Sequence, residues 1–201
     1  MKILVTGFEP FDSEAVNPSR LVLTALPERL GSAEILTLAL PVSFLRAPAL
    51  ALAAVKREQP DAVLSLGQAG GRVGLTLERI AVNLADARIP DNDGFQPREA
   101  LLCSGGPDGL FTTLPVQELL QGIRQSGIPA SQSLSAGAFV CNALMYQLLY
   151  RAPMVPSGFL HLPWLHEQAL KRAGQPSLSL EDMAAGVSAC LSSLANCLKD
   201  G

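Results

Sequence analysis

The sequence has few charged residues and lacks the segments that nucleic acids and membranes require. Only 16% of its 201 residues are charged, the formal net charge is −3, and no run of Lys or Arg occurs. Because a basic patch marks most nucleic-acid-binding proteins, we expect no nucleic-acid partner. The apolar stretches are too short to cross a bilayer, and the longest helical one, residues 44–55, contains Arg46 and Pro48. We therefore expect no membrane segment.

Cysteine and histidine are also scarce. There are two histidines and four cysteines, and no two cysteines stand in CxxC spacing. A zinc site is not expected from so few ligands. Residues 1–7 have too short an apolar run for a signal peptide, and Glu9 and Asp12 follow at once. We expect free thiols in a cytoplasmic protein, at Cys103, Cys141, Cys190 and Cys197.

What the sequence does contain is a large apolar fraction divided by many turns. The length of 201 residues suits one domain or at most two small ones, and the 48% of apolar residues allow a large core. The 15 prolines and 17 glycines argue against a helical bundle. Strand patterns alternate with helical ones, which predicts a single α/β domain, residues 1–201, with helices on both sides of a mostly parallel sheet. Strands are predicted at residues 2–6, 33–39, 61–66, 74–83, 130–135 and 157–163, and helices at 17–26, 44–58, 115–126, 142–150 and 179–197. The polar loop at 84–104 is long enough to be functional.

The stretch from Ser133 to Asn142 is the candidate for a catalytic centre. It indicates a strand end, a small-residue turn around Gly137, and a helix that begins near Asn142. Cys141 then lies near a helix N-terminus, where free N–H groups and the helix dipole favour the nucleophilic thiolate. A buried structural thiol is the alternative, because free cysteine is among the most buried residue types.

A cysteine nucleophile needs a base and a group that orients the base. His161 is the better of the two histidines, because it lies at the carboxyl end of a predicted strand, whereas His166 belongs to a polar turn or helix; each can also be an ordinary core or surface residue. Glu78 is a charged residue within an otherwise apolar strand. A charged side chain at such a position is unusual unless it is paired. Its alternatives are an ion pair with Arg79 or Arg88, or a place on an exposed strand edge.

Two further features suit a ligand. The glycine-rich turn at 67–72 can present backbone N–H groups to a phosphate or an oxyanion, although it lacks both the GxGxxG and the P-loop patterns. Phe8, Phe11 and Phe139 lie in glycine-flanked loops. They are either core residues or the walls of an apolar pocket.

These motifs together resemble the pyroglutamyl peptidase I family of cysteine peptidases. The resemblance covers the chain in family order up to the last helix and rests on residues 6–11 with Asn17-Pro18, and on 67–72, 77–83, 87–94, 135–142 and 158–163. It implies a single α/β/α sandwich around a twisted sheet, often assembled as a homotetramer in the cytoplasm. It also implies that the chain removes an N-terminal pyroglutamyl residue from peptides without a metal or cofactor.

Residue by residue, the resemblance implies that Cys141 is the nucleophile, His161 the general base and acid, and Glu78 the orienting carboxylate. Arg88 is implied to contribute to the oxyanion site. The implied pyroglutamate pocket consists of Phe8, Phe11, Gln68, Phe139 and Val140.

The chain departs from the family pattern at a few positions. Ser135 and Ala138 replace common threonines, Leu134 replaces a polar residue, and His166 replaces a frequent proline. We expect these changes to affect the rate more than the type of reaction. Two other functions remain open on the sequence: a phosphorylase-like or nucleotide-handling enzyme that uses the 67–72 turn, and a non-catalytic binder of peptides or metabolites.

Overall fold

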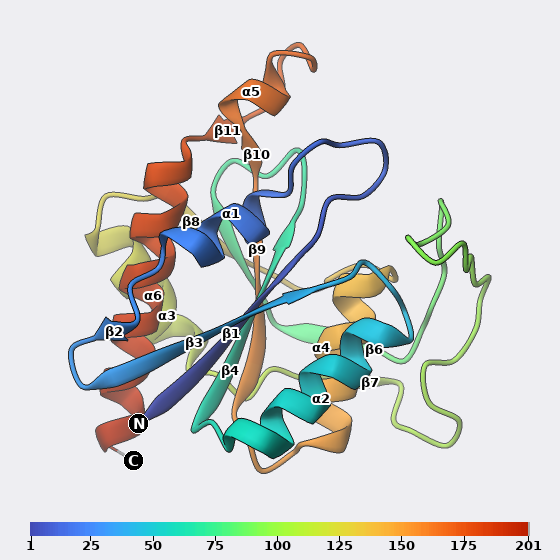
Figure 1. The fold of residues 1–201 in the computed structure, drawn as a ribbon, viewed down its shortest axis with the longest axis horizontal. Coiled ribbons are helices and arrows are strands. Elements are labelled where there is room, and N and C mark those ends of the chain that lie inside the picture. The colour runs from blue at the N-terminus through green and yellow to red at the C-terminus, as the bar shows by residue number, and fades with distance from the viewer. Residues whose placement is uncertain (201) are drawn as a thin grey trace.

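The computed structural model describes residues 1–200 and shows a mixed sheet between two helical layers (Figure 1). The main sheet has seven strands in the order β2-β3-β1-β4-β9-β5-β8. Neighbouring strands are parallel except at β2–β3 and β9–β5, where they are antiparallel. The strands are β1 (Lys2–Phe8), β2 (Arg29–Leu30), β3 (Ala33–Leu40), β4 (Ala62–Gln68), β5 (Leu75–Glu78), β8 (Ala130–Ser133) and β9 (Ser157–Leu162).

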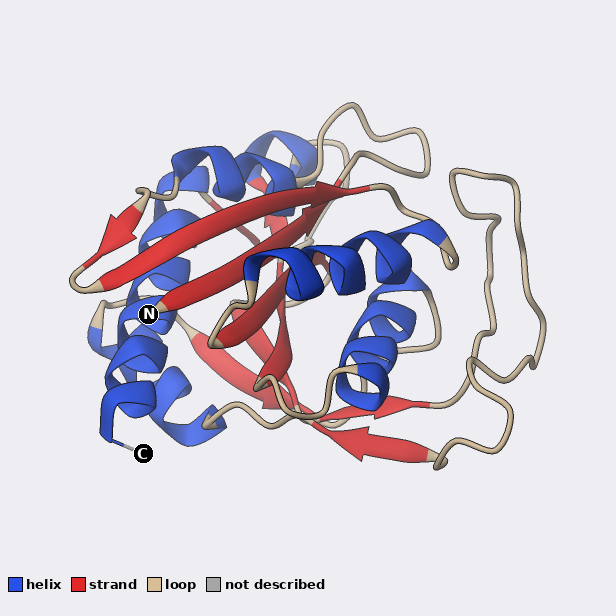
Figure 2. Ribbon diagram, turned by 60° about the horizontal axis from the view of Figure 1, so that its bottom comes forward, coloured by secondary structure: helices blue, strands red, loops and turns tan. Residues whose placement is uncertain are grey.

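Helices cover both faces of this sheet, as the alternating pattern predicts. One apolar core lies between the sheet and α1 (Pro18–Ala25), α3 (Val116–Gln125) and α6 (Leu180–Asp200). A second core lies between the opposite face and α2 (Arg46–Glu58) and α4 (Val140–Arg151). Figure 1 places α3 and α6 on one side of the sheet and α2 and α4 on the other, and Figure 2 shows helices on both faces of the sheet. The predicted α/β fold class is confirmed.

Alternation of side chains along the central strands explains the two cores. In β4, Leu64 and Leu66 belong to the core under α1, α3 and α6, whereas Val63 belongs to the core under α2 and α4. Successive side chains of a strand point to opposite faces. A strand that is buried on both faces is therefore apolar throughout, as residues 62–66 are apart from Ser65.

The helix at Pro18 begins as the sequence predicts. Asn17 is its N-cap, and the Asn17 side chain accepts a hydrogen bond from the backbone N–H of Ser19. Ser19 in turn accepts a hydrogen bond from the backbone N–H of Phe8 at 2.9 Å. This chain of contacts fixes the end of β1 against the start of α1.

Three sequence predictions are wrong in detail. Residues 74–83 are not one strand, because β5 ends at Glu78 and β6 (Ile80–Val82) pairs with β7 (Gly109–Phe111) in a separate two-stranded sheet. Phe8 is not in a loop: it ends β1 and is buried. The helix after Ser133 begins at Val140 rather than near Asn142.

The remaining short elements gather near the carboxyl ends of β4 and β9. β10 (Trp164–Leu165) pairs with β11 (Ser177–Leu178), and α5 (His166–Ala169) lies between them in sequence. Figure 1 shows these three elements at the top of the molecule, beyond the end of β9. Within residues 1–200, none of the helices is long and apolar enough to cross a membrane.

Candidate active site

Strand register brings His161 and Glu78 to the face of the sheet that α4 covers. His161 pairs with Gly67 of β4 on one side and with Thr76 of β5 on the other. Paired residues of neighbouring strands point to the same face, and so do residues two apart along a strand. His161, Thr76 and Glu78 therefore share one face, which is the face of the core that contains Phe159 and α4.

His161 and Glu78 form a buried pair. The Nδ1 atom of His161 lies 2.8 Å from Oε1 of Glu78, and both side chains are at most 5% exposed. Because a carboxylate only accepts, the contact favours the tautomer with the proton on Nδ1 and leaves Nε2 as an acceptor. This is the arrangement that a general base requires.

Glu78 has one further partner, which is not an arginine that the sequence suggested. The Nη2 atom of Arg72 lies 3.4 Å from Oε1 of Glu78. The guanidinium of Arg79 lies instead over the Phe111 ring, 5.7 Å from its centroid. Oε2 of Glu78 is buried and has no hydrogen-bond partner among the described residues. Of the alternatives for Glu78, an ion pair with Arg79 or Arg88 does not occur among the described residues, and an exposed place is ruled out because Glu78 is fully buried.

Cys141 reaches the same face from the first turn of α4. A Cβ atom placed on Gly67 would lie 2.9 Å from Sγ of Cys141 and 2.7 Å from the Phe159 ring. Gly67 is the register partner of His161, so the thiol lies beside the strand position that neighbours the imidazole. Glycine at 67 leaves the room that the thiol occupies.

The environment of the thiol differs from the expected one. Burial, with a smaller contribution from the negative charge of Glu78, raises the pKa of Cys141 to about 12, and a backbone hydrogen bond lowers it only in part. Some of the Cys141 residue is still exposed, but the sulfur is enclosed by its neighbours. The helix N-terminus therefore does not by itself produce a resting thiolate, and the thiol needs a base.

An apolar cavity opens at Cys141. It is narrow, and its volume of about 230 Å³ includes the open solvent at its mouth. The five residues that the resemblance implies for the pocket all line it, together with Cys141, Asn17 and Val42: they are Phe8, Phe11, Gln68, Phe139 and Val140. Sequence reasoning identified Asn17 only as a helix cap and missed Val42.

The aromatic walls of this cavity support one another. The Phe139 ring lies 6.2 Å from Phe11 and makes an edge contact with Phe44 at 5.3 Å. The Phe8 ring lies 6.4 Å from Phe159. Such ring contacts fix the shape of an apolar slot.

Gln68 is the polar side chain of the cavity whose amide nitrogen can donate a hydrogen bond to a ligand. Its Oε1 atom accepts a hydrogen bond of 3.1 Å from the amide of Gln168, which is buried in α5. The structure shows no partner for the Gln68 amide nitrogen within residues 1–200. Gln168 was missed, because its sequence position gives no sign that α5 folds back onto β4.

Arg88 does not line the cavity that contains Cys141. It is exposed and lines two neighbouring hollows, one shared with Phe11 and Gln68 and the other with Phe11 and Phe139. The structure thus places Arg88 at the rim of the site.

Asn142 is a second residue whose importance the sequence did not reveal. It is fully buried in α4, and its side chain bonds the backbone N–H and C=O of Val82 and the C=O of Leu84. Asp91 similarly accepts from the backbone N–H groups of Phe44 and Phe95. Asn142 thus fixes the start of the 84–104 loop beside the helix that carries Cys141, and Asp91 fixes the middle of the loop against Phe44.

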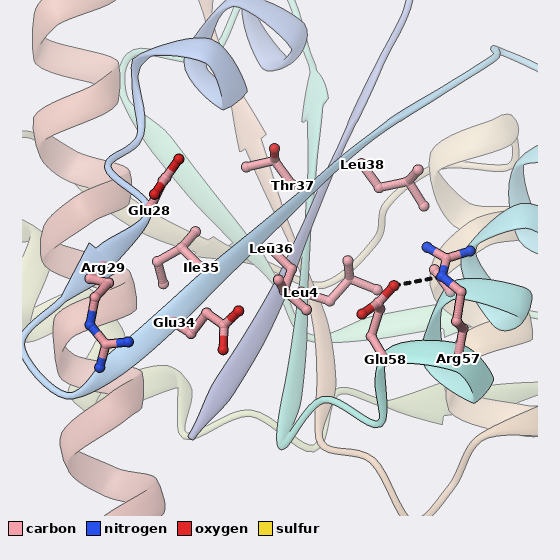
Figure 3. A pocket seen from close by; sticks show the side chains of 11 residues that line it. Leu4, Glu28, Arg29, Glu34, Ile35, Leu36, Thr37, Leu38, Arg57 and Glu58 are labelled. Atoms are coloured by element: carbon pink, nitrogen blue, oxygen red, sulfur yellow. Dashed lines mark hydrogen bonds and ion pairs between the residues drawn. The ribbon is translucent and has the colours of Figure 1, made fainter.

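A separate hollow lies at the β2–β3 edge of the sheet, along β3 and the end of α2 (Figure 3). Its rim is charged, and Arg57 and Glu58 form an ion pair there at 2.5 Å. None of Cys141, His161 and Glu78 lines it. Residues 1–200 also contain no cluster of three or more His, Cys, Asp or Glu that suits a metal ion.

Comparison with known proteins gives one consistent result. The family model described as pyroglutamyl peptidase matches residues 1–196. A pyrrolidone-carboxylate peptidase of Levilactobacillus brevis is 46% identical over 195 residues, which are 95% of this chain and 96% of that protein. One of Lactobacillus johnsonii is 43% identical over 198 residues, which are 96% and 92% of the two chains.

Solved structures agree with the sequence comparison. Pyroglutamyl peptidase I of Bacillus amyloliquefaciens is 40% identical, with a TM-score of 0.92 over 97% of both chains. Pyrrolidone carboxyl peptidase of Thermococcus litoralis is 33% identical, with a TM-score of 0.94 over 99% of this chain and 95% of the other. The match therefore extends over the sequence and the fold, and this chain belongs to the pyroglutamyl peptidase family of cysteine hydrolases.

Proposed function

We propose that this protein hydrolyses the amide bond that follows an N-terminal pyroglutamyl residue in peptides, with a triad of Cys141, His161 and Glu78. The observation that carries the proposal is the cavity at Cys141, which is lined by apolar side chains and two amides and by no charged residue. A pyroglutamyl ring is neutral and needs no acidic anchor. The buried contact between His161 and Glu78 on the same face of the sheet supports the catalytic roles.

The reaction begins with attack of Sγ of Cys141 on the carbonyl carbon of the pyroglutamyl residue. Because burial keeps the thiol neutral at rest, Nε2 of His161 takes the thiol proton as the carbon–sulfur bond forms. Glu78 holds the ring at Nδ1 and compensates the charge of the imidazolium. The product of this step is a tetrahedral oxyanion.

The oxyanion is stabilised by donors at the rim of the cavity. Helix α4 has no side-chain N-cap, so the backbone N–H groups of its first turn are free to donate. Arg88 is proposed to add a positive charge from the adjacent hollow. The intermediate then expels the amine, which takes the proton from His161, and a thioester remains on Cys141. Water, deprotonated by His161, hydrolyses the thioester and releases pyroglutamate.

Specificity follows from the few polar groups in the slot. The free amide nitrogen of Gln68 is suited to donate to the lactam carbonyl, while the phenylalanine rings contact the methylene groups. Proline lacks that carbonyl and would leave the donor unpaired. We expect kcat/KM for a prolyl amide to be at least about 10³-fold lower than for the pyroglutamyl amide, because sites built to bond a polar group reject analogues without it.

The decisive experiment compares wild type with Cys141→Ala on a pyroglutamyl chromogenic amide, with and without iodoacetamide. We expect wild type to turn over, iodoacetamide to abolish turnover, and Cys141→Ala to be inactive. Turnover that persists in Cys141→Ala would end the thiol mechanism. A requirement for phosphate, with resistance to alkylation, would indicate a phosphorylase-like enzyme. Binding of the amide without hydrolysis would indicate a non-catalytic binder.

The family resemblance further suggests a homotetramer in the cytoplasm, with residues 1–201 as one catalytic domain, and we propose these as part of the function. Light scattering on the purified chain measures the assembly directly. A mass of four chains, about 85 kDa from 21.2 kDa each, is the expected result. A monomeric mass at working concentration would contradict it.

A further inference from the structure

Arg72 occupies a position that the proposed mechanism does not use. It lies in the connection between β4 and β5, and its side chain is 35% exposed. Its Nη2 atom lies 3.4 Å from Oε1 of Glu78 and 3.5 Å from Oγ of Ser133. Ser133 is the register partner of Glu78 on β8. The guanidinium therefore reaches in from the surface to the position that orients the catalytic imidazole.

The carboxylate of Glu78 has very few partners for a buried group. Both donors that approach it, His161 and Arg72, approach Oε1, and Oε2 has no hydrogen bond among the described residues. An unpaired charge in a buried site carries a large free-energy cost. His161 is neutral when it acts as a base, so it cannot compensate the charge of Glu78 at the start of the reaction. Arg72 is the permanent cation that the structure places beside this carboxylate.

We propose that Arg72 is a positioning residue of this site, which restrains Glu78 through Oε1 and offsets its negative charge before His161 takes the proton. The proposal rests on the function proposed above. It adds a fourth side chain to the set of Cys141, His161 and Glu78. Arg72 acts through Glu78 and contacts neither the thiol nor the substrate cavity.

The expected effect of removing Arg72 follows from the influence of Glu78 on the Cys141 thiolate. The charge of Glu78 is one of the causes that disfavour the thiolate of Cys141. Removal of Arg72 leaves that charge less compensated, so the thiolate becomes less accessible and the imidazole is less well held. Both changes slow attack by sulfur, whereas the pyroglutamate cavity is unaltered. Removal of Arg72 should therefore lower kcat and leave KM nearly unchanged.

The experiment measures hydrolysis and thiol alkylation for Arg72→Met, Arg72→Lys and Arg79→Met. Arg79 is the matched control, because it is adjacent to Glu78 in sequence while its side chain lies over Phe111. We expect Arg72→Met to lower kcat and the rate of Cys141 alkylation about tenfold each, with KM within threefold, because the carboxylate of the pair is fully buried and the arginine is only 35% exposed. Arg72→Lys should recover part of the loss, and Arg79→Met should match wild type.

Two further arms separate positioning from folding. Millimolar guanidinium chloride should partly restore the kcat of Arg72→Ala and should not change the kcat of wild type. Sodium chloride at the same ionic strength is the control. In a Glu78→Gln background, Arg72→Met should have a much smaller effect, because the partner is gone. An unchanged kcat in Arg72→Met, a loss confined to KM, or an equal loss in the Glu78→Gln background would overturn the proposal. If wild type fails to hydrolyse the amide, the proposed function is wrong, and the alkylation ratio alone decides the role of Arg72.

Discussion

Gly67 is a residue at which the site depends on the lack of a side chain. Its register partner is His161, and a Cβ atom there would lie within 3 Å of both the Phe159 ring and the Cys141 sulfur. Neither neighbour can move freely, because Phe159 is fully buried and Cys141 is fixed by the first turn of α4. The sequence predicted a glycine-rich turn that begins here, whereas Gly67 lies within β4, and it could not show which glycine faces the thiol.

We predict that Gly67→Ala lowers kcat by about 10²-fold and destabilises the protein by roughly 1–3 kcal/mol, since overpacking displaces the thiol and the ring. Steady-state kinetics and urea unfolding measure the two effects. Gly109→Ala is the matched control in a strand, because a Cβ atom there meets its nearest neighbour at an ordinary 3.5 Å. Wild-type kinetics in Gly67→Ala would show that the thiol does not work from the position seen here.

His161 and Glu78 were identified from sequence, but the reason they meet was not. A histidine at a strand end and a glutamate in an apolar run are each ambiguous alone. What brings them together is the antiparallel pairing of β5 with β9, which sets Thr76 opposite His161. Pairing between distant strands leaves no local signal, so only the family motifs pointed to it.

The same limit explains the errors at the scale of elements. Residues 74–83 alternate well enough for one strand, yet the chain leaves the main sheet after Glu78 and pairs with β7 instead. Short strands such as β7, β10 and β11 have no period long enough to detect. By contrast, Asn17-Pro18 carries a local capping signal, and that helix start was predicted correctly.

Asn142 joins two of these elements, because its side chain makes three hydrogen bonds from α4 to residues 82 and 84. We predict that Asn142→Ala lowers the free energy of unfolding by about 2–4 kcal/mol, since buried backbone groups lose their partners. It should also lower kcat, because Cys141 is the preceding residue.

Urea unfolding of Asn142→Ala and Gln147→Ala tests this. Gln147 bonds the carbonyl of Leu102 from further along α4, and its loss should cost about 1 kcal/mol and leave kcat unchanged. Equal effects of the two substitutions would mean that the β6 contact has no special role in holding the helix start.

At the scale of the whole molecule, burial of thiols makes stability depend on pH. Burial raises the pKa of both Cys141 and Cys190 to about 12 from an ordinary value of 9.0. A folded-state pKa above the unfolded one means that the folded protein retains protons that the unfolded chain releases. The resulting stability is fully present below pH 9 and is lost as the pH rises toward 12.

We therefore predict that the free energy of unfolding falls between pH 8 and pH 10, by roughly 1.4 kcal/mol for each buried thiol. Urea unfolding at a series of pH values measures the slope. Cys190→Ala should lose about half of this pH dependence, whatever its effect on stability at pH 7. An unchanged slope in Cys190→Ala would show that the thiol of α6 is not the group responsible.

The fold as a whole was the most predictable level, because strand and helix patterns alternate along nearly the entire chain. The two helical layers and the mostly parallel order both follow from that pattern. The antiparallel pairing of β5 with β9 and the contact of α5 with Gln68 could not be predicted from the pattern. Both depend on contacts between residues far apart in sequence.

The central claim is that sulfur 141 attacks the carbonyl of a pyroglutamyl group bound in the adjacent slot. Labelling with a pyroglutamyl chloromethyl ketone, followed by peptide mapping with mass spectrometry, tests it most directly. The account predicts one label per chain on Cys141, appearing in step with the loss of activity and more slowly in His161→Ala. Activity lost while Cys141 remains unlabelled, with the label on another residue, would contradict it.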